Sequence, residues 1–143
     1  GTIMKLDIAQ KIVTAALAHA RSKSMKPLSV VILDDRGALK AAASEDGTSL
    51  KRAEIAIAKA HGALAMGMGS RSLFTRAQQQ PYFIAAATHA VGQLVPVPGG
   101  VLILDANKAL LGAIGISGDT SDNDEEAALA GIGAAGLTGD PGA

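Results

Sequence analysis

Two pairs of apolar segments, each joined by a short polar turn, most constrain what this chain can fold into. Residues 28–33 and 38–44 flank the turn Asp34-Asp35-Arg36-Gly37, and residues 101–104 and 109–116 flank the turn Asp105-Ala106-Asn107-Lys108. Strands joined by so short a turn have to pair antiparallel, because a parallel crossover needs about a dozen residues or more. The sequence therefore predicts two β-hairpins rather than a doubly wound parallel sheet.

Helices are predicted around these hairpins. From residue 5 to residue 25, apolar side chains recur at the spacing of one helical face, and Pro27 ends that helix. Thr48 or Ser49 is expected to cap the second helix. The predicted helices cover residues 5–25, 48 or 49 to about 68, 70–79 and 125–137, while residues 82–91 form either a helix or a packed loop. This order predicts a layered α+β domain.

Small side chains dominate the predicted core. Of the 143 residues, 48% are hydrophobic, but the aromatic ones are only Phe74, Tyr82 and Phe83, and glycine occurs 17 times. This length supports one buried core, so we expect a single domain over residues 1–143, with residues 1–4 and 138–143 as flexible tails. The core has to close through close approach of small residues, and faces of this kind are compatible with a homo-oligomer.

Charge and residue usage exclude several classes of function. Lysine and arginine total 13, as do aspartate and glutamate, so no basic excess is available to neutralise a nucleic-acid backbone. Cysteine is absent, which excludes disulfides, thiolate metal sites and cysteine nucleophiles. No segment approaches the roughly 20 apolar residues of a membrane span. We therefore expect a cytoplasmic protein that binds neither nucleic acid nor membrane.

The three histidines fall on different predicted elements, so no pair has the spacing of a local zinc site. His61 lies on the apolar stripe of its helix, where a hydrogen-bonded core histidine is the favoured interpretation. His19 lies beside the stripe of the first helix, at an edge where a ring nitrogen can reach a ligand. His89 lies in an apolar stretch and would either bond to backbone or face a pocket.

Residues 112–118 contain three glycines between a strand and the last helix, an arrangement that superficially resembles a phosphate-binding loop. Five acidic residues follow, and at a helix N-terminus these would repel a phosphate while satisfying free N–H groups. They are Asp119, Asp122, Asp124, Glu125 and Glu126. Helix capping is thus the favoured interpretation, and a nucleotide site is disfavoured.

Two arginines, Arg71 and Arg76, lie near the glutamines of residues 78–80. A guanidinium can bind a carboxylate through two parallel hydrogen bonds, so these arginines are candidates for holding a small organic acid. Two solvated arginines on a polar helix are the more ordinary interpretation. The serine-elbow, metalloprotease and Walker motifs are absent, which removes the familiar hydrolase and kinase classes.

Several sequence blocks, taken in their order, resemble the GlcG/HbpS family, which includes the C-terminal domain of PduO-type proteins. The resemblance spans about Leu6 to Leu137. The blocks are Val30 to Gly37, Glu45-Asp46-Gly47, Ala56 to Ala60, Gln80-Pro81-Tyr82, Val97 to Val101, Leu111 to Gly118, Asp124-Glu125 and Ala130-Gly131.

This resemblance implies a profilin-like domain, an antiparallel sheet with helices on both faces, that assembles into symmetric homo-oligomers. It also implies haem binding, and a first-helix histidine as the iron ligand, which is His19 in this sequence. Arg21 and Lys23 are the nearby cations for the haem propionates. The shortage of aromatic residues predicts a shallow, weak site.

Two functions from different classes follow from these observations, and haem binding, sensing or handling is the favoured one. The alternative is an accessory enzyme that acts on a small organic acid by acid/base chemistry, since other family members are encoded in catabolic operons. That enzyme would use His89 or His61 as its acid or base, Asp46 or Glu54 as the orienting carboxylate, and Arg71 or Arg76 for the substrate carboxylate. An assembly subunit that binds no ligand is a third possibility.

Overall fold

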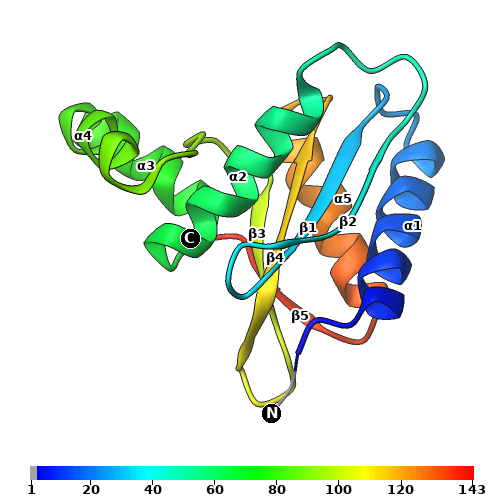
Figure 1. Ribbon diagram of the computed structural model, residues 1–143. Helices are drawn as coiled ribbons and strands as arrows, with labels where there is room; N and C mark the ends of the chain where they lie inside the picture. Colours follow the sequence, from blue (N-terminus) through cyan, green and yellow to red (C-terminus); the bar gives the residue numbers. More distant parts are fainter. Residues whose placement is uncertain (1–2) are drawn as a thin grey trace.

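The computed structural model describes residues 3–143, within which the chain forms five helices and five strands (Figure 1). The helices are α1 (Leu6–Ser22), α2 (Arg52–Met66), α3 (Ser70–Gln79), α4 (Pro81–Val91) and α5 (Ser121–Ala134). The strands are β1 (Ser29–Asp34), β2 (Leu39–Ser44), β3 (Gly100–Leu104), β4 (Leu110–Ser117) and β5 (Thr138–Asp140).

The strands form one sheet in the order β2-β1-β4-β3-β5, and every neighbouring pair is antiparallel. Both predicted hairpins are present, and they meet where β1 pairs with β4, with Ile32 opposite Ile114. The same Ile114 lies opposite Val101 of β3. The α+β fold with an antiparallel sheet is thereby confirmed.

Helices cover both faces of this sheet, as expected. On one face Val30 and Ile32 of β1 pack into the cluster that contains α1 and α5, and on the other face Val31 and Leu33 pack against α2 (Figure 1). Because successive strand residues point to opposite faces, a strand buried on both faces has to be apolar throughout. The run Val30 to Leu33 meets that requirement.

Small residues close the core, and two glycines show why. A Cβ atom added at Gly115 of β4 would lie 1.8 Å from the carbonyl oxygen of Ala56 in α2. A Cβ atom at Gly131 of α5 would lie 2.7 Å from the carbonyl oxygen of Ile12 in α1. These helices therefore approach their neighbours more closely than any side chain at either position would permit.

Two helices begin at positions other than those predicted. Helix α2 begins at Arg52 with Lys51 as its N-cap, so neither Thr48 nor Ser49 caps it. Helix α5 begins at Ser121, four residues earlier than Glu125, because the Thr120 hydroxyl accepts a hydrogen bond from the Asn123 N–H at 3.2 Å. Acidic side chains are stabilising in a first helical turn, which is why the polar segment is helical.

The middle and the end of the chain are more ordered than the sequence indicated. Residues 81–91 form helix α4, with Pro81 in the first helical positions, where its missing N–H has no cost. Helices α3 and α4 form a hairpin that projects from the rest of the domain (Figure 1). Strand β5 pairs with β3 at Leu102 to Leu104, where the sequence predicted a flexible tail.

At the other end of the chain, Met4 is 3% exposed, while residues 1 and 2 lie outside the described residues. Within residues 3–143, no helix is both long enough and apolar enough to cross a bilayer.

Candidate functional site

His19 lies near the end of α1, and its imidazole reaches across to α5. The Nε2 atom of His19 is 2.7 Å from Oε2 of Glu126, and the two side chains are 25% and 52% exposed. This contact is a hydrogen bond when the ring is neutral and an ion pair when it is protonated. The structure thus places His19 at an accessible surface between two helices, with a carboxylate on its outer nitrogen.

The two cations predicted beside His19 differ in their surroundings. The Arg21 guanidinium pairs with Glu45 at 3.0 Å and donates hydrogen bonds to the carbonyl oxygens of Met25 and Lys26 at 2.7 and 3.0 Å. Arg21 therefore fixes the connection from α1 to β1. Lys23 is exposed, and within residues 3–143 its ammonium has no hydrogen-bond or ion-pair partner. Of these two cations, Lys23 is the one whose charged group is free to meet an incoming anion.

Open cavities occur at both ends of α1, but His19 lines neither. Arg21 contributes to a cavity of about 470 Å³ that also includes Pro27, Ser44 and Glu45. At the N-terminal end, a mainly apolar cavity of about 300 Å³ is lined by Ile3, Met4, Lys5, Asp7, Ile8, Leu111, Ala135 and Leu137. A flat ligand held by His19 would accordingly lie on the α1–α5 surface rather than inside the domain.

His61 is half-buried on α2, whereas the helical spacing favoured a buried core histidine. Its Nδ1 atom lies 2.7 Å from the carbonyl oxygen of Gln93, and this hydrogen bond to the backbone holds the ring. The ring lines a recess of about 170 Å³ with residues 35–37 and with Leu64 and Ala65.

The remaining candidates for acid/base chemistry are not brought together. His89 is exposed at the end of α4 and has no hydrogen-bond partner within residues 3–143. Arg76 lies over the Phe83 ring, 3.9 Å from its centroid, and donates to the Gln80 side chain. His61 and Arg71 line different cavities. Of the two orienting carboxylates, Asp46 is exposed and Glu54 pairs with Lys51 at 3.7 Å.

Arg71 is already neutralised by the chain itself. Its Nε and a terminal nitrogen bind both carboxylate oxygens of Glu125 at 3.0 and 3.1 Å, and it also pairs with Asp122. The hydrogen bonds from Glu125 and Asp122 raise the pKa of the Arg71 guanidinium above its usual range. This geometry ties α3 to the first turn of α5, and it leaves the guanidinium no free edge for a substrate carboxylate.

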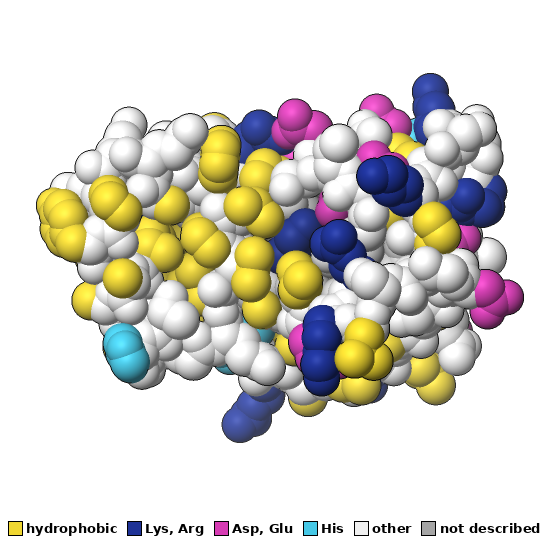
Figure 2. Space-filling view, turned by 90° about the horizontal axis from the view of Figure 1, so that it is seen from above, with side chains coloured by type: hydrophobic (Ala, Val, Ile, Leu, Met, Phe, Trp, Pro, Cys, Tyr) yellow, Lys and Arg dark blue, Asp and Glu magenta, His cyan; other side chains and the backbone are white. Residues whose placement is uncertain are grey.

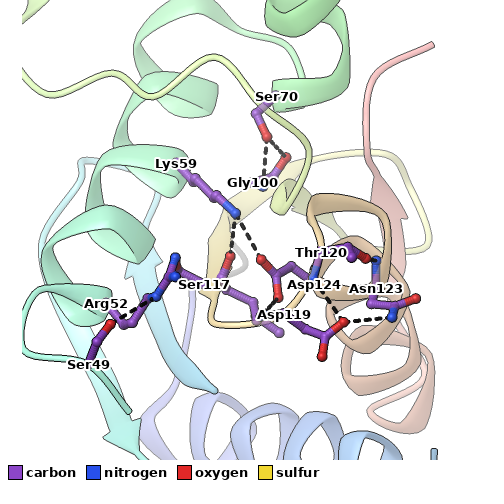
Figure 3. A network of polar contacts seen from close by, with 11 residues as sticks. Ser49, Arg52, Lys59, Ser70, Gly100, Ser117, Asp119, Thr120, Asn123 and Asp124 are labelled. Atoms are coloured by element: carbon purple, nitrogen blue, oxygen red, sulfur yellow. Dashed lines mark hydrogen bonds and ion pairs between the residues drawn. The ribbon is translucent and has the colours of Figure 1, made fainter. Parts of the chain in front are cut away.

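The most buried charges in the described chain form a pair that sequence reasoning did not identify. Lys59 of α2 and Asp124 of α5 are 2% and 1% exposed, and Nζ lies 3.1 Å from Oδ2 (Figure 3). Nζ also donates to the carbonyl oxygen of Ile116 at 2.9 Å. Burial lowers the pKa of Lys59, and the charge of Asp124 opposes that effect. One signal was available, since Lys59 is a charged residue on the alanine-rich buried face of its helix.

Further polar contacts extend from this pair to the ends of the strands (Figure 3). Asp124 accepts a hydrogen bond from the Asp119 N–H at 2.9 Å, and Ser117 accepts one from Arg52 at 3.2 Å. The Ser70 hydroxyl accepts one from the Gly100 N–H at 2.7 Å. Asp124, predicted only as a helix cap, therefore also joins α5 to α2 through Lys59. The contacts to the strand ends are made by Lys59, Arg52 and Ser70.

Taken with the histidine at the α1–α5 surface, this architecture defines a class of small α+β proteins in which helices cover both faces of an antiparallel sheet. The family model described as "Haem degrading protein HbpS-like" matches residues 4–133, and the chain belongs to that family. The resemblance read from the sequence blocks is confirmed. No curated protein matches the chain.

Solved structures agree with this assignment. A haem complex of PduOC is 25% identical, with a TM-score of 0.84 over 95% of this chain and 97% of that one. HbpS is 26% identical, with a TM-score of 0.80 over 93% of this chain and 90% of that one. The ORFY protein of Klebsiella pneumoniae shares the fold, with a TM-score of 0.83 over 95% of this chain and 93% of that one. Its sequence is 19% identical.

Proposed function

We propose that this protein binds haem at the α1–α5 surface, with His19 as the iron ligand. The observation that carries the proposal is an accessible imidazole on α1, in a chain that aligns over 95% of its length with a haem-bound relative. The donor chemistry fits, since imidazole is a common axial ligand of haem iron and the Lys23 ammonium is free for a propionate.

The surroundings of His19 support a weak site. His19 lines neither of the cavities at the ends of α1, so a haem bound on the α1–α5 surface keeps much of its own surface in water, unlike ligands in enclosed pockets. Arg21 is held by Glu45 and contributes charge without a free donor edge. Glu126 occupies Nε2, and ligation through that atom requires the carboxylate to move away.

The proposal includes a homo-oligomer in the cytoplasm. Large apolar side chains are strongly exposed in the single chain, among them Leu39, Leu50 and Tyr82. Seen from above, apolar side chains gather over the α3–α4 half of the molecule, while charged side chains gather on the other half (Figure 2). Light scattering of the purified protein tests this part, and a monomer at micromolar concentration would contradict it.

Titration with haemin, followed by absorbance in the Soret region, tests the proposed haem site. The unmodified protein is expected to give a saturable shift, and His19→Ala is expected to weaken its tightest phase by more than about tenfold, because the axial donor is lost. His89→Ala is the matched control, since that histidine is exposed on α4. Equal affinities for the unmodified protein and His19→Ala would exclude His19 as the ligand.

A further inference from the structure

Helix α4 is the most apolar of the five helices, yet little of it is buried. Of its 11 residues, all within the described chain, only Ile84 is buried. Tyr82 is 70% exposed, and Ala85, Ala86 and Ala90 are exposed as well. An apolar helix in a globular protein normally turns its apolar side to a core. The outer side of α4 therefore lacks the partner that its composition requires.

Charged side chains are absent from this part of the sequence. Residues 77–104 contain no lysine, arginine, aspartate or glutamate, and α4 lies within that run. Strand β3, at the end of the same run, is largely buried, whereas α4 is exposed. Figure 2 shows the result, because apolar side chains gather over the α3–α4 half of the surface and charged ones over the other half. An exposed apolar area without charge is typical of the centre of a protein–protein contact.

The exposed residues of α4 share one face of the helix. Tyr82, Ala86 and Ala90 are spaced four residues apart and so form one row, which we call the α4 row, with Ala85 and His89 beside it. The α3–α4 hairpin projects from the domain, so a partner can approach α4 without meeting the sheet (Figure 1). The α4 row has its large side chain at one end and small ones at its centre and its other end.

The α4 row is complementary to a second copy of itself. When two α4 helices pack antiparallel about a two-fold axis at Ala86, Tyr82 of each copy lies opposite Ala90 of the other, because both are four residues from the axis. A large side chain then meets a small one at both ends of the contact. Alanine meets alanine at its centre, which permits close approach of the helices. No like charges face each other, since the α4 row carries none.

We infer that α4 pairs antiparallel with α4 of a second copy, about a two-fold axis at Ala86. This inference rests on the homo-oligomer of the proposed function and names one of its contacts. A pair of 11-residue helices is smaller than a stable interface of about 1,200–2,000 Å², so the contact acts together with others in the assembly. A membrane is a less suitable partner, because both cations of α3 are engaged: Arg76 lies over Phe83, and Arg71 pairs with Glu125.

Disulfide formation between copies tests the axis directly, because the chain has no cysteine of its own. In Ala86→Cys the two sulfur atoms face each other across the axis, and a glutathione redox buffer is expected to convert most of the protein to a disulfide-linked dimer. Ala90→Cys is the matched control on the same row. Its two cysteines would lie about 12 Å apart along the helices, beyond the roughly 7 Å between Cα atoms that a disulfide can span.

Both positions are exposed, so both cysteine variants are expected to fold like the unmodified chain. Non-reducing gel electrophoresis measures the fraction of linked dimer. If Ala86→Cys forms no linked dimer, or if Ala90→Cys forms as much of it, the proposed axis is wrong.

A charge at the same position tests the contact without sulfur chemistry. In Ala86→Glu two carboxylates face each other on the axis, so we expect assembly to require at least about tenfold more protein, as measured by light scattering over a concentration series. Ala106→Glu, in the exposed β3–β4 turn, is the control and is expected to assemble like the unmodified chain. Unchanged assembly of Ala86→Glu would overturn the inference and leave the proposed homo-oligomer standing.

A monomeric unmodified chain would contradict both the homo-oligomer and the pairing of α4. Binding of that monomer to phosphatidylcholine vesicles, lost in Ala86→Glu, would then identify a membrane as the partner of this face. Haemin titration tests the His19 site separately in either case.

Discussion

The Nε2 atom of His19 can hold either a proton for Glu126 or a bond to iron, but not both. Glu126 contacts it at 2.7 Å in the haem-free chain, so the carboxylate competes directly with the proposed ligand. The contact is partly exposed, and pairs of this kind contribute about 0.2–1 kcal/mol. The competition is modest but measurable.

We expect Glu126→Ala to tighten haemin binding by up to about fivefold, because the competing carboxylate is removed. Glutamine at the same position should give a smaller gain, since its amide can still hydrogen-bond to the ring. Glu54→Ala, which changes an exposed carboxylate of α2, is the control. Weaker binding in Glu126→Ala would show that the carboxylate supports the ligand instead of competing with it.

Asp119 is a second single residue with a testable effect, a pH-dependent contribution to the stability of the fold. The backbone N–H of Lys26, 2.7 Å away, is the main reason that its pKa is lowered, with further hydrogen bonds from Asn123 and Thr120. A carboxylate whose pKa is lower in the folded chain binds fewer protons there than in the unfolded chain. Its contribution to stability is therefore full above the unfolded pKa and is lost as pH falls through the folded one.

Asp119→Asn is accordingly expected to cost about 1 kcal/mol at pH 7, since the hydrogen bonds to a partly exposed charge become ordinary ones. The difference from the unmodified protein should shrink below about pH 4, where the carboxyl group of the unfolded chain takes up its proton. Urea unfolding at a series of pH values measures the loss of stability at pH 7 and its decrease at low pH. A constant difference across that series would contradict the assignment.

Single side chains were easier to select from the sequence than their partners. His19 could be placed at the edge of its helix by spacing alone, but Glu126 lies 107 positions away. Lys59 and Asp124 are separated by 65 positions, and nothing local distinguished Asp124 from the capping acids beside it. Contacts over such separations depend on how layers pack, which helical periodicity does not encode.

At the scale of elements, the packing of α2 on β4 depends on the absence of a side chain at Gly115. We expect Gly115→Ala to destabilise the protein by about 3 kcal/mol or more, because its Cβ would lie 1.8 Å from the Ala56 carbonyl oxygen and both elements are fixed in the core. Thermal or urea unfolding measures the effect.

Gly133→Ala is the matched control, since no atom lies within 4 Å of its added Cβ and it sits in helix α5. Alanine there is expected to raise stability by up to about 1 kcal/mol through helix propensity. Equal effects of the two changes would show that Gly115 is not a packing contact.

Elements with a strong local signal were predicted correctly, namely the two hairpins and α1. The errors occurred where long-range contacts or end effects decide the structure. Strand β5 has three residues and forms only because β3 offers it an edge. Helix α4 covers the segment that the sequence left undecided between a helix and a packed loop, and it begins with Pro81, because proline is tolerated in a first turn.

At the scale of the whole molecule, Lys59 and Asp124 join the two helical layers through the end of the sheet. Removing one partner leaves a buried charge unpaired, which typically costs about 3–5 kcal/mol. We expect Lys59→Met to lose that amount in a single unfolding transition, measured with urea. Lys59→Met with Asp124→Asn should recover a large part, because the amide is neutral and can still accept from the Asp119 N–H.

A loss below about 1 kcal/mol in Lys59→Met would mean that the pair contributes little, as many ion pairs do. Oligomer size measured on the same samples separates an effect on the chain from an effect on assembly.

The projecting hairpin of α3 and α4 has a small apolar cluster of its own, built around Leu73, Ile84 and Leu94. A unit with so few buried side chains opens at lower free energy than the sheet that carries it. Its amides should exchange with deuterium through local opening, while those of β1 and β4 exchange only when the whole chain unfolds. The chain would then carry one segment that can loosen and close again without disturbing the His19 imidazole, which lies between α1 and α5.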